Sequence, residues 1–180
     1  MKAAIFGGSF DPPHTGHDAI VKSALKDLDI DRLYIVPTWM SPFKDGFSAT
    51  PEQRLAWTKR LWENLPNVTI IDYEIRQQRS VPSAETVQYI KGCYPISHLY
   101  LIVGADNFQS LPRWYRYDEL LEEVEIVVAN RDGRPLPKDL KKLPIHVNIS
   151  SSILRESPNP DFIPTSIREE VLSYYKQGNQ

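Results

Sequence analysis

Several features that would define a protein class are scarce or missing in this sequence. Cys93 is the only cysteine, so the chain can form neither an intrachain disulfide nor a cysteine-based zinc cage. No apolar run approaches the roughly 20 residues that span a bilayer, and the apolar stretch at the start is too short for a signal peptide. A basic excess is also missing, because 21 Lys and Arg stand against 23 Asp and Glu. These absences predict a soluble cytoplasmic protein that binds neither membranes nor nucleic acids.

Common motifs of other nucleotide-binding and hydrolytic enzymes are absent too. The sequence has no G-x-G-x-x-G after its first expected strand, no G-x-x-x-x-G-K-[ST], no G-x-S-x-G and no H-E-x-x-H. Dehydrogenase, P-loop and hydrolase interpretations therefore lose their main support. There is also no internal repeat and no linker, and 180 residues are too few for two comfortable domains. Residues 1–180 are expected to form one domain.

Short apolar runs alternate with segments of helical periodicity along the chain. Strands are expected at 3–6, 33–36, 68–71, 99–103, 124–128 and 145–149, and helices at 16–28, 51–61, 83–91, 117–123 and 166–175. A capping-box spacing between Ser166 and Glu169 supports the start of the last helix. The order predicts a Rossmann-like α/β fold, a doubly wound open parallel sheet whose ligands bind outside the carboxyl ends of the strands. Residues 38–49 and 130–144 remain as long loops, which are often functional.

The first expected strand ends in a glycine-rich turn, and two histidines follow it. The paired Gly7 and Gly8 allow the backbone to approach a ligand closely at the ligand-binding end of the sheet. His14 and His17 lie three residues apart at the start of a helix, with Gly16 between them leaving the approach open. This spacing turns both imidazoles toward one face, beside the unpaired amides of the first turn. Imidazole N–H groups, backbone amides and the helix dipole together predict a phosphate site.

Two well-separated motifs give the chain a family resemblance. Residues 14–17 read His-Thr-Gly-His and resemble the H-x-G-H signature of the nucleotidyltransferase superfamily. Residues 149–155 resemble the I-S-S-T-x-x-R signature of the same superfamily, with serine in place of its threonine. The finer match is to the bacterial nicotinate-nucleotide adenylyltransferases, whose opening G-G-S-F-D-P is present at residues 7–12.

Shorter segments extend this resemblance over nearly the whole chain. Residues 42–44 resemble the family's P-x-K loop, and residues 104–107 followed by 114–115 resemble its middle motif. The segment beside the pyridine site, roughly S-Y-T-x-D-T in the family, is Val-Pro-Ser-Ala-Glu-Thr at residues 81–86. The resemblance implies adenylyl transfer from ATP to nicotinate mononucleotide, which gives deamido-NAD and pyrophosphate in NAD biosynthesis.

The resemblance also implies roles for particular residues. The charge that develops on the reacting phosphates would be stabilised by His14, His17, Lys44 and Arg155. Further contacts to ATP are assigned to Gly7, Gly8, Ser9, Phe10, Gly104, Asp106, Ser150, Ser151 and Ser152. Contacts to the pyridine nucleotide are assigned to Ser83, Thr86, Trp114 and Tyr115. Mg²⁺ would bridge the phosphates and be held mainly by ATP and water, so no metal site built by the protein is expected.

Taken alone, many of these residues allow a second interpretation. The two histidines also fit helix capping, a surface position or half of a metal site. Ser150–Ser152 and Asp106 also fit helix N-caps, Lys44 fits a solvated surface lysine, and Trp114 and Tyr115 fit the core. Two alternative functions stay open beside the first. One is adenylylation of nicotinamide mononucleotide or another phosphate-bearing small molecule, and the other is a nucleotide-binding or RNA-binding module without catalysis.

Overall fold

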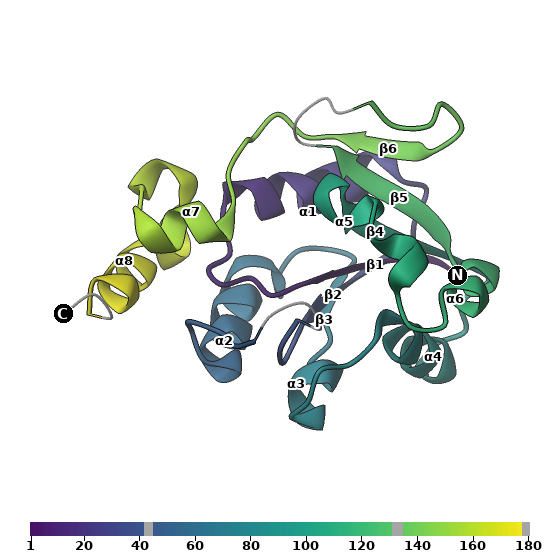
Figure 1. Cartoon of the computed structure of the whole chain (residues 1–180), viewed down its shortest axis with the longest axis horizontal. Helices are drawn as coiled ribbons and strands as arrows, with labels where there is room; N and C mark the ends of the chain where they lie inside the picture. The colour runs from purple at the N-terminus through teal and green to yellow at the C-terminus, as the bar shows by residue number, and fades with distance from the viewer. Residues whose placement is uncertain (42–44, 131–134, 178–180) are drawn as a thin grey trace.

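The computed structural model describes residues 1–41, 45–130 and 135–177, which form one open α/β sheet with helices on both faces (Figure 1). The strands of this part of the chain are all parallel and lie in the order β3-β2-β1-β4-β5-β6. They are β1 (Lys2–Gly8), β2 (Arg32–Pro37), β3 (Val68–Ile70), β4 (His98–Gly104), β5 (Glu125–Asn130) and β6 (Lys141–Pro144). The strand order reverses between β1 and β4, which is the topology of the predicted Rossmann-like sheet.

Helices connect and cover these strands. They are α1 (Thr15–Asp27), α2 (Pro51–Trp62), α3 (Tyr73–Gln77), α4 (Ser83–Cys93), α5 (Ala105–Phe108), α6 (Tyr117–Glu123), α7 (Ser151–Glu156) and α8 (Arg168–Gln177). Three short 3₁₀ helices occupy Leu111–Arg113, Pro160–Phe162 and Thr165–Ile167. The start of α2 follows the local signals closely, because the Thr50 side chain accepts the Gln53 N–H and Pro51 fills the first position.

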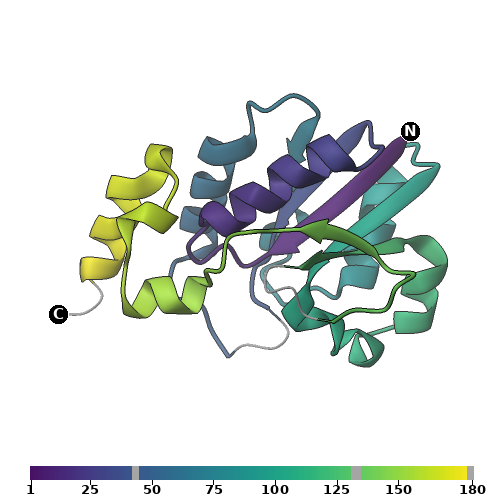
Figure 2. The same ribbon diagram turned by 90° about the horizontal axis from the view of Figure 1, so that it is seen from above.

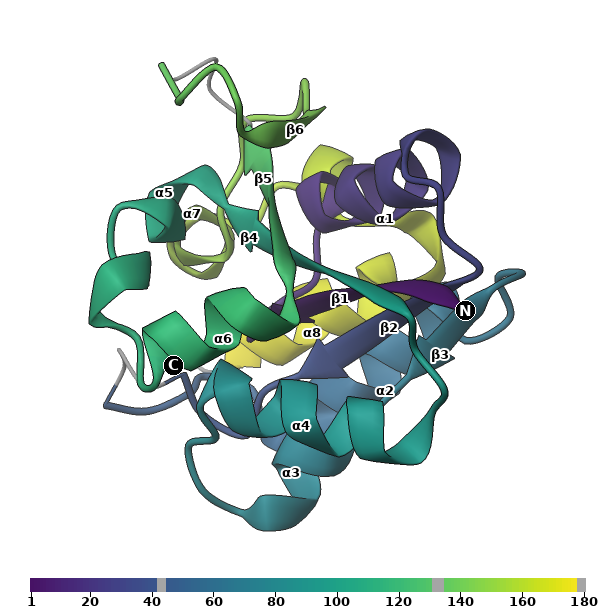
Figure 3. The same cartoon turned by 90° about the vertical axis from the view of Figure 1, so that its right-hand side faces the viewer.

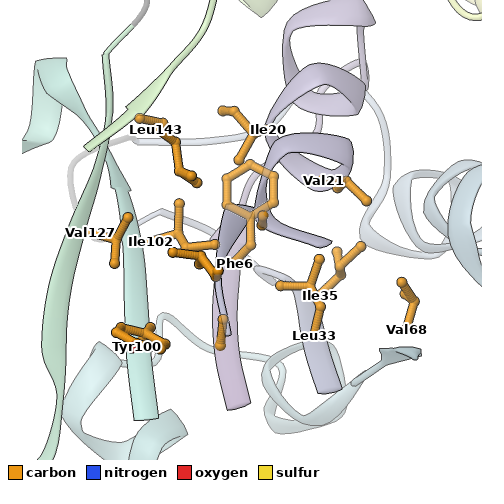
Figure 4. Packing of buried hydrophobic residues seen from close by; sticks show 14 of the residues in the cluster. Phe6, Ile20, Val21, Leu33, Ile35, Val68, Tyr100, Ile102, Val127 and Leu143 are labelled. Atoms are coloured by element: carbon orange, nitrogen blue, oxygen red, sulfur yellow. The ribbon is translucent and has the colours of Figure 1, made fainter. Parts of the chain in front are cut away.

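The core consists of two apolar layers, one on each face of the sheet. In β1, Phe6 faces α1 while Ile5 faces the layer under α4, because successive side chains of a strand point to opposite faces. Figure 4 shows Phe6 beside Ile20 of α1 in the first layer. The second layer includes Leu120 of α6, and Figure 3 shows α1 and α4 on opposite faces of the sheet. Burial on both faces explains why the central strands read as continuous apolar runs.

The C-terminal helices form a third apolar cluster beyond the carboxyl end of β1. Trp57 of α2 packs there with Leu154 of α7 and with Val171 and Tyr175 of α8. Figure 2 shows α7 and α8 together on the side toward which β1 runs. This position places the motif at residues 149–155 at the ligand-binding end of the sheet.

Three expectations about secondary structure are wrong. The last strand is β6 (Lys141–Pro144), inside the expected loop, whereas residues 145–149 are not a strand. Ile145 and Ile149 are buried in two different clusters as the chain crosses from the sheet to α7, so their apolar pattern reflects two packing sites. The polar β6 is an edge strand, and edge strands need no apolar run.

The other two errors concern helices. The last helix begins at Arg168, and the Ser166 capping spacing falls within the preceding 3₁₀ turn, whose Ile167 is buried beneath α2 and α8. The five-residue α3 has no counterpart among the expected elements, because one and a half turns are too short to show helical periodicity.

Candidate active site

His14 and His17 hold the start of α1 together through a reciprocal pair of hydrogen bonds. The His17 backbone N–H donates to His14 Nδ1 (3.3 Å), and the His14 backbone N–H donates to His17 Nδ1 (3.2 Å). This is a capping box in which imidazoles replace the usual hydroxyl and carboxylate. The two rings also stack, with centroids 3.7 Å apart and planes 19° from parallel. The two histidines therefore cap the helix and also lie beside the amides of its first turn, so the two interpretations of these residues are compatible.

These bonds decide which ring nitrogens can donate to a ligand. Because each Nδ1 accepts a backbone N–H, a neutral imidazole at either position carries its proton on Nε2. His14 is only 1% exposed, whereas His17 is half-buried, so His17 is the more accessible of the two. The capping box thus orients both imidazoles at the start of α1, with His14 Nε2 buried and the His17 ring nearer to solvent.

Gly16 has a more specific role than leaving room for a ligand. A Cβ at this position would lie 3.0 Å from two atoms of the His14 ring and 3.3 Å from the Ile149 side chain. Such contacts are shorter than normal van der Waals separation, so a larger residue would displace the His14 imidazole. The glycine of the H-x-G-H motif is needed here to seat the first histidine.

Phe10, in the turn after β1, packs against the His17 ring. Its backbone has a φ of 49°, and its ring is 1% exposed. The ring packs edge-on against His17, with centroids 5.0 Å apart, and against Trp62 of α2 at 5.5 Å. A Cβ on Gly8 would lie 3.0 Å from the Phe10 ring, so this glycine allows the turn to close over it. Any contact between Phe10 and ATP would come from its backbone.

The second motif is held against the glycine-rich turn by direct hydrogen bonds. Ser150 caps α7 by accepting the Ile153 N–H (3.3 Å), and Ser151 Oγ donates to the Pro12 carbonyl (2.9 Å). Arg155 donates from Nη1 to the Asp11 carbonyl (2.6 Å). Its Nη2 donates to Ser152 Oγ (3.2 Å). Residues 139 and 144 positions apart in sequence therefore lie in direct contact, which brings the start of α7 beside the turn that precedes α1.

Arg54 is a buried charged residue beside this site that the sequence interpretation missed. It is 1% exposed and donates to the backbone carbonyls of Ser9 (2.5 Å) and Thr38 (2.8 Å), which follow the carboxyl ends of β1 and β2. A signal was available, because Arg54 lies one turn before Trp57 on the apolar face of α2. A charge in that position calls for buried partners.

On the other face of the sheet, Gly104 ends β4 and α5 follows directly. Asp106 is exposed in the first turn, and the N-cap position is held by Gly104. The N-cap alternative for Asp106 is therefore wrong, and its carboxylate lies at the carboxyl end of a strand adjacent to β1. Trp114 is half-buried against the second core layer, whereas Tyr115 is 61% exposed. The alternative that these two residues belong to the core is therefore partly correct for Trp114 and wrong for Tyr115.

The residues assigned to the pyridine nucleotide differ in how open they are. Ser83 begins α4 and is half-buried, but Thr86 is only 3% exposed. The Thr86 hydroxyl donates to Glu74 Oε1 of α3 at 2.6 Å. Burial raises the pKa of Glu74 to about 7, while the hydrogen bond from Thr86 acts in the opposite direction. The structure places Thr86 in the interior, where it joins α3 to the first turn of α4.

Two predictions concern Lys44 and metal binding. Lys44, with the rest of the segment at residues 42–44, lies outside the described residues, so its role stays a prediction. Within the described ranges, no group of three or more His, Cys, Asp or Glu side chains is arranged to hold a metal ion. None of the helices in those same ranges is both long enough and apolar enough to cross a membrane.

Comparison with known proteins identifies the family of this chain. The family model described as cytidylyltransferase-like matches residues 5–157. A Campylobacter jejuni protein (strain RM1221) named "Probable nicotinate-nucleotide adenylyltransferase" is 47% identical over 177 residues, covering 98% of each chain. A Campylobacter fetus protein of the same name is 48% identical over 99% of each chain. The fold and the paired motifs, taken with these matches, define a nucleotidyltransferase.

A solved structure extends the comparison to the fold as a whole. The Plasmodium falciparum nicotinic acid mononucleotide adenylyltransferase, complexed with NaAD, superposes with a TM-score of 0.75 over 99% of this chain and 96% of that chain. Its sequence identity is 18%, so this likeness concerns the fold alone. On the sequence matches, the chain belongs to the cytidylyltransferase-like family and, within it, to the bacterial nicotinate-nucleotide adenylyltransferase family.

Proposed function

We propose that this protein transfers the adenylyl group of ATP to nicotinate mononucleotide, releasing pyrophosphate and forming deamido-NAD for NAD biosynthesis. The names of the Campylobacter relatives support this reaction. The observation that carries it in this chain is the imidazole capping box at the start of α1, together with Arg155, which donates to the Asp11 carbonyl in the turn before that helix. Such a site suits a polyanion whose negative charge changes position during the reaction.

The reaction needs positioning and charge stabilisation more than proton transfer. A phosphate oxygen of nicotinate mononucleotide is already anionic, so it attacks the α-phosphorus of ATP without a general base. The new P–O bond forms as the bond to the β-phosphate oxygen breaks, and that electron pair leaves with pyrophosphate. Negative charge therefore grows on the α-phosphate oxygens and on the leaving group.

Each charged residue of the site has a defined part in this scheme. His17 donates its Nε2–H to the α-phosphate, and His14 orients His17 through the capping box and the ring stack. Arg155 is held by the Asp11 carbonyl and by Ser152, so its charge is preorganised for the outer phosphates. Lys44 neutralises the departing pyrophosphate. ATP enters as its Mg²⁺ complex, with the ion coordinated mainly by phosphate oxygens and water.

The pyridine nucleotide binds on the other side of the carboxyl ends of β1 and β4. The nicotinate carboxylate binds backbone N–H groups near Ser83, where α4 begins without a side-chain cap, and near Tyr115. The partial positive charge of the helix start favours this carboxylate. The amide of nicotinamide would direct its own N–H₂ group at one of these donors. The ring packs on Trp114. The exposed Asp106 carboxylate is assigned to the ribose hydroxyls of ATP.

Pyrophosphate release tests the proposal directly. The purified protein is incubated with Mg²⁺ and ATP, together with nicotinate mononucleotide, nicotinamide mononucleotide or no acceptor, and products are identified by mass spectrometry. We expect deamido-NAD and an equal amount of pyrophosphate with the nicotinate substrate. Faster turnover with the nicotinamide form would replace the substrate assignment, and nucleotide binding without pyrophosphate release would point to a non-catalytic module.

A further inference from the structure

The guanidinium of Arg54 has an unusual set of partners for a buried charge. It donates four hydrogen bonds, and all of the acceptors are backbone carbonyl oxygens. They are Ala49 with Nε (3.1 Å), Ser9 and Thr38 with Nη1 (2.5 and 2.8 Å), and Trp39 with Nη2 (2.6 Å). Three separate stretches of chain therefore meet at one side chain, namely the turn after β1, the segment after β2 and the residue pair that precedes α2.

A contribution to folding alone explains this arrangement poorly. Burial lowers the pKa of Arg54, while the charge of Asp11 raises it, so the interior is an unfavourable place for the cation. An apolar side chain of similar volume usually serves fold stability at least as well as a buried charge. A planar fork can, however, bind several carbonyls at once in a set geometry, which no apolar side chain can do.

Asp11 complements Arg54 at the same place. Its carboxylate accepts the backbone N–H groups of Ser48 (2.8 Å) and Ala49 (2.9 Å), and it also accepts the Tyr175 hydroxyl of α8. The Ala49 carbonyl thus accepts a hydrogen bond from Arg54, and the Ala49 N–H donates one to Asp11. Both side chains are almost fully buried, with exposures of 1% and 3%.

This buried pair is continuous with the site. The backbone carbonyl of Asp11 accepts a hydrogen bond from Arg155. Phe10, the residue before Asp11, packs against His17. The carbonyl of Ser9 accepts a hydrogen bond from Arg54, which fixes the orientation of this peptide. A carbonyl dipole facing a polyanion is repulsive, so the orientation of this peptide matters for any reaction in which phosphate charge grows.

We propose that Arg54 is a positioning residue for adenylyl transfer, which with Asp11 holds the turn at residues 8–11 so that His17 and Arg155 face the same phosphates. This inference rests on the proposed function. Its physical content is geometric, because Arg54 contacts no reacting atom and acts through the backbone of the turn. A displacement of about 1 Å at a reacting centre can slow turnover on the order of 100-fold.

The test is Arg54→Lys, which keeps the charge but replaces the fork by a single ammonium that cannot reach all the carbonyls. Thr58→Val is the matched control, because Thr58 lies one turn further on α2 and is equally buried, and its hydroxyl donates to the Arg54 carbonyl (2.7 Å). Near-UV circular dichroism and thermal midpoints establish the folded fraction, and kcat and the KM for ATP are measured well below each midpoint.

We expect Arg54→Lys to lower kcat at least about tenfold per folded molecule, with a smaller change in the KM for ATP. Thr58→Val should lose stability and keep kcat within about twofold, since its loss does not touch the turn. Equal kcat values for the two variants, with an active wild type, would overturn the positioning role and leave the proposed function intact. A wild type that releases no pyrophosphate would instead remove the proposed function.

If Arg54→Lys does not fold, a second pair of variants tests the positioning role. Tyr175→Phe removes the hydroxyl that Asp11 accepts, and Tyr174→Phe removes a neighbouring hydroxyl on the same helix. We expect kcat to fall about three- to tenfold in Tyr175→Phe and to remain at the wild-type value in Tyr174→Phe. Unchanged kcat in both variants would show that the buried pair does not set the geometry of the site, and the inference would be wrong.

Discussion

Replacing His17 by alanine separates the two tasks that the structure gives to this residue. The capping task is lost with Nδ1, which accepts the His14 backbone N–H at 3.2 Å, and a lost cap costs about 1 kcal/mol. The ring also stacks on His14 and packs edge-on against Phe10, and losing these aromatic contacts costs about 1 kcal/mol more. For a protein of this length a total of about 2 kcal/mol lowers the thermal midpoint by about 4–8 °C. The variant should therefore fold, with a measurable loss of stability.

The second task is the donor at Nε2, and its loss should dominate the kinetics. Removing one preorganised donor to transition-state charge costs about 10²–10³-fold in kcat, or about 2.7–4 kcal/mol. The affinity for ATP should change much less, since Arg155 and the start of α7 remain in place. Pyrophosphate release gives kcat, and titration calorimetry gives the dissociation constant of ATP.

A matched control removes a cap of the same size outside the site. Asn159→Ala deletes the side-chain acceptor of the Asp161 N–H (3.0 Å) at an exposed 3₁₀ turn. This variant should lower the midpoint by about 2–4 °C, half the drop of His17→Ala because no aromatic contact is lost, with kcat unchanged. A His17→Ala enzyme that keeps kcat within threefold of the wild type, at a temperature where it is folded, would show that Nε2 is not directed at the reacting phosphate.

Three further predictions follow from individual contacts. Gly16→Ala should displace the His14 ring, because the added Cβ would lie 3.0 Å from that ring. We expect kcat to fall at least about tenfold while the circular dichroism spectrum stays native. Wild-type turnover in this variant would contradict the prediction. Glu74, whose pKa burial raises to about 7, should make the protein lose stability as the pH rises from about 5 to 8, because the folded state favours the protonated carboxyl more than the unfolded chain does. Urea unfolding across that range should show the slope in the wild type and its absence in Glu74→Gln, and equal slopes would refute the assignment. Nicotinate mononucleotide should have a kcat/KM at least ~100-fold above that of the nicotinamide form, a difference of about 2.7 kcal/mol, and Trp114→Ala should raise the KM for the mononucleotide more than that for ATP. Comparable kcat/KM values for the two mononucleotides would disprove the proposed selectivity.

The local pattern of the sequence was sufficient for the fold class and for the local geometry of the two motifs. The central strands are buried on both faces, so they appear as apolar runs that need no knowledge of their neighbours. His14, Gly16 and His17 lie within one turn of one helix, and their spacing alone determines that the imidazoles share a face. The serines at 150–152 cap a helix for the same local reason.

The remaining features depended on which distant segments the fold brings together. β6 is polar because a strand at the edge of the sheet buries few of its side chains. Thr86 lies in the interior because Glu74 of α3 packs over it and accepts its hydroxyl. The meeting of Ser151 with Pro12 joins residues 139 positions apart, which no local periodicity reveals. Trp114 lies partly in the core because its side chain meets the layer under α4, and its position in the sequence does not show this.

Arg54 illustrates the physical reason for this division. In the sequence it is an arginine on the apolar face of α2, a conflict between charge and burial that predicts a buried partner without naming one. Its four acceptors are backbone carbonyls, and every residue has a backbone carbonyl, so no pattern of side chains identifies them. The sequence by itself determined that α2 carries a charge toward the interior. Only the tertiary structure decided that this charge holds the turn on which the two histidines rest.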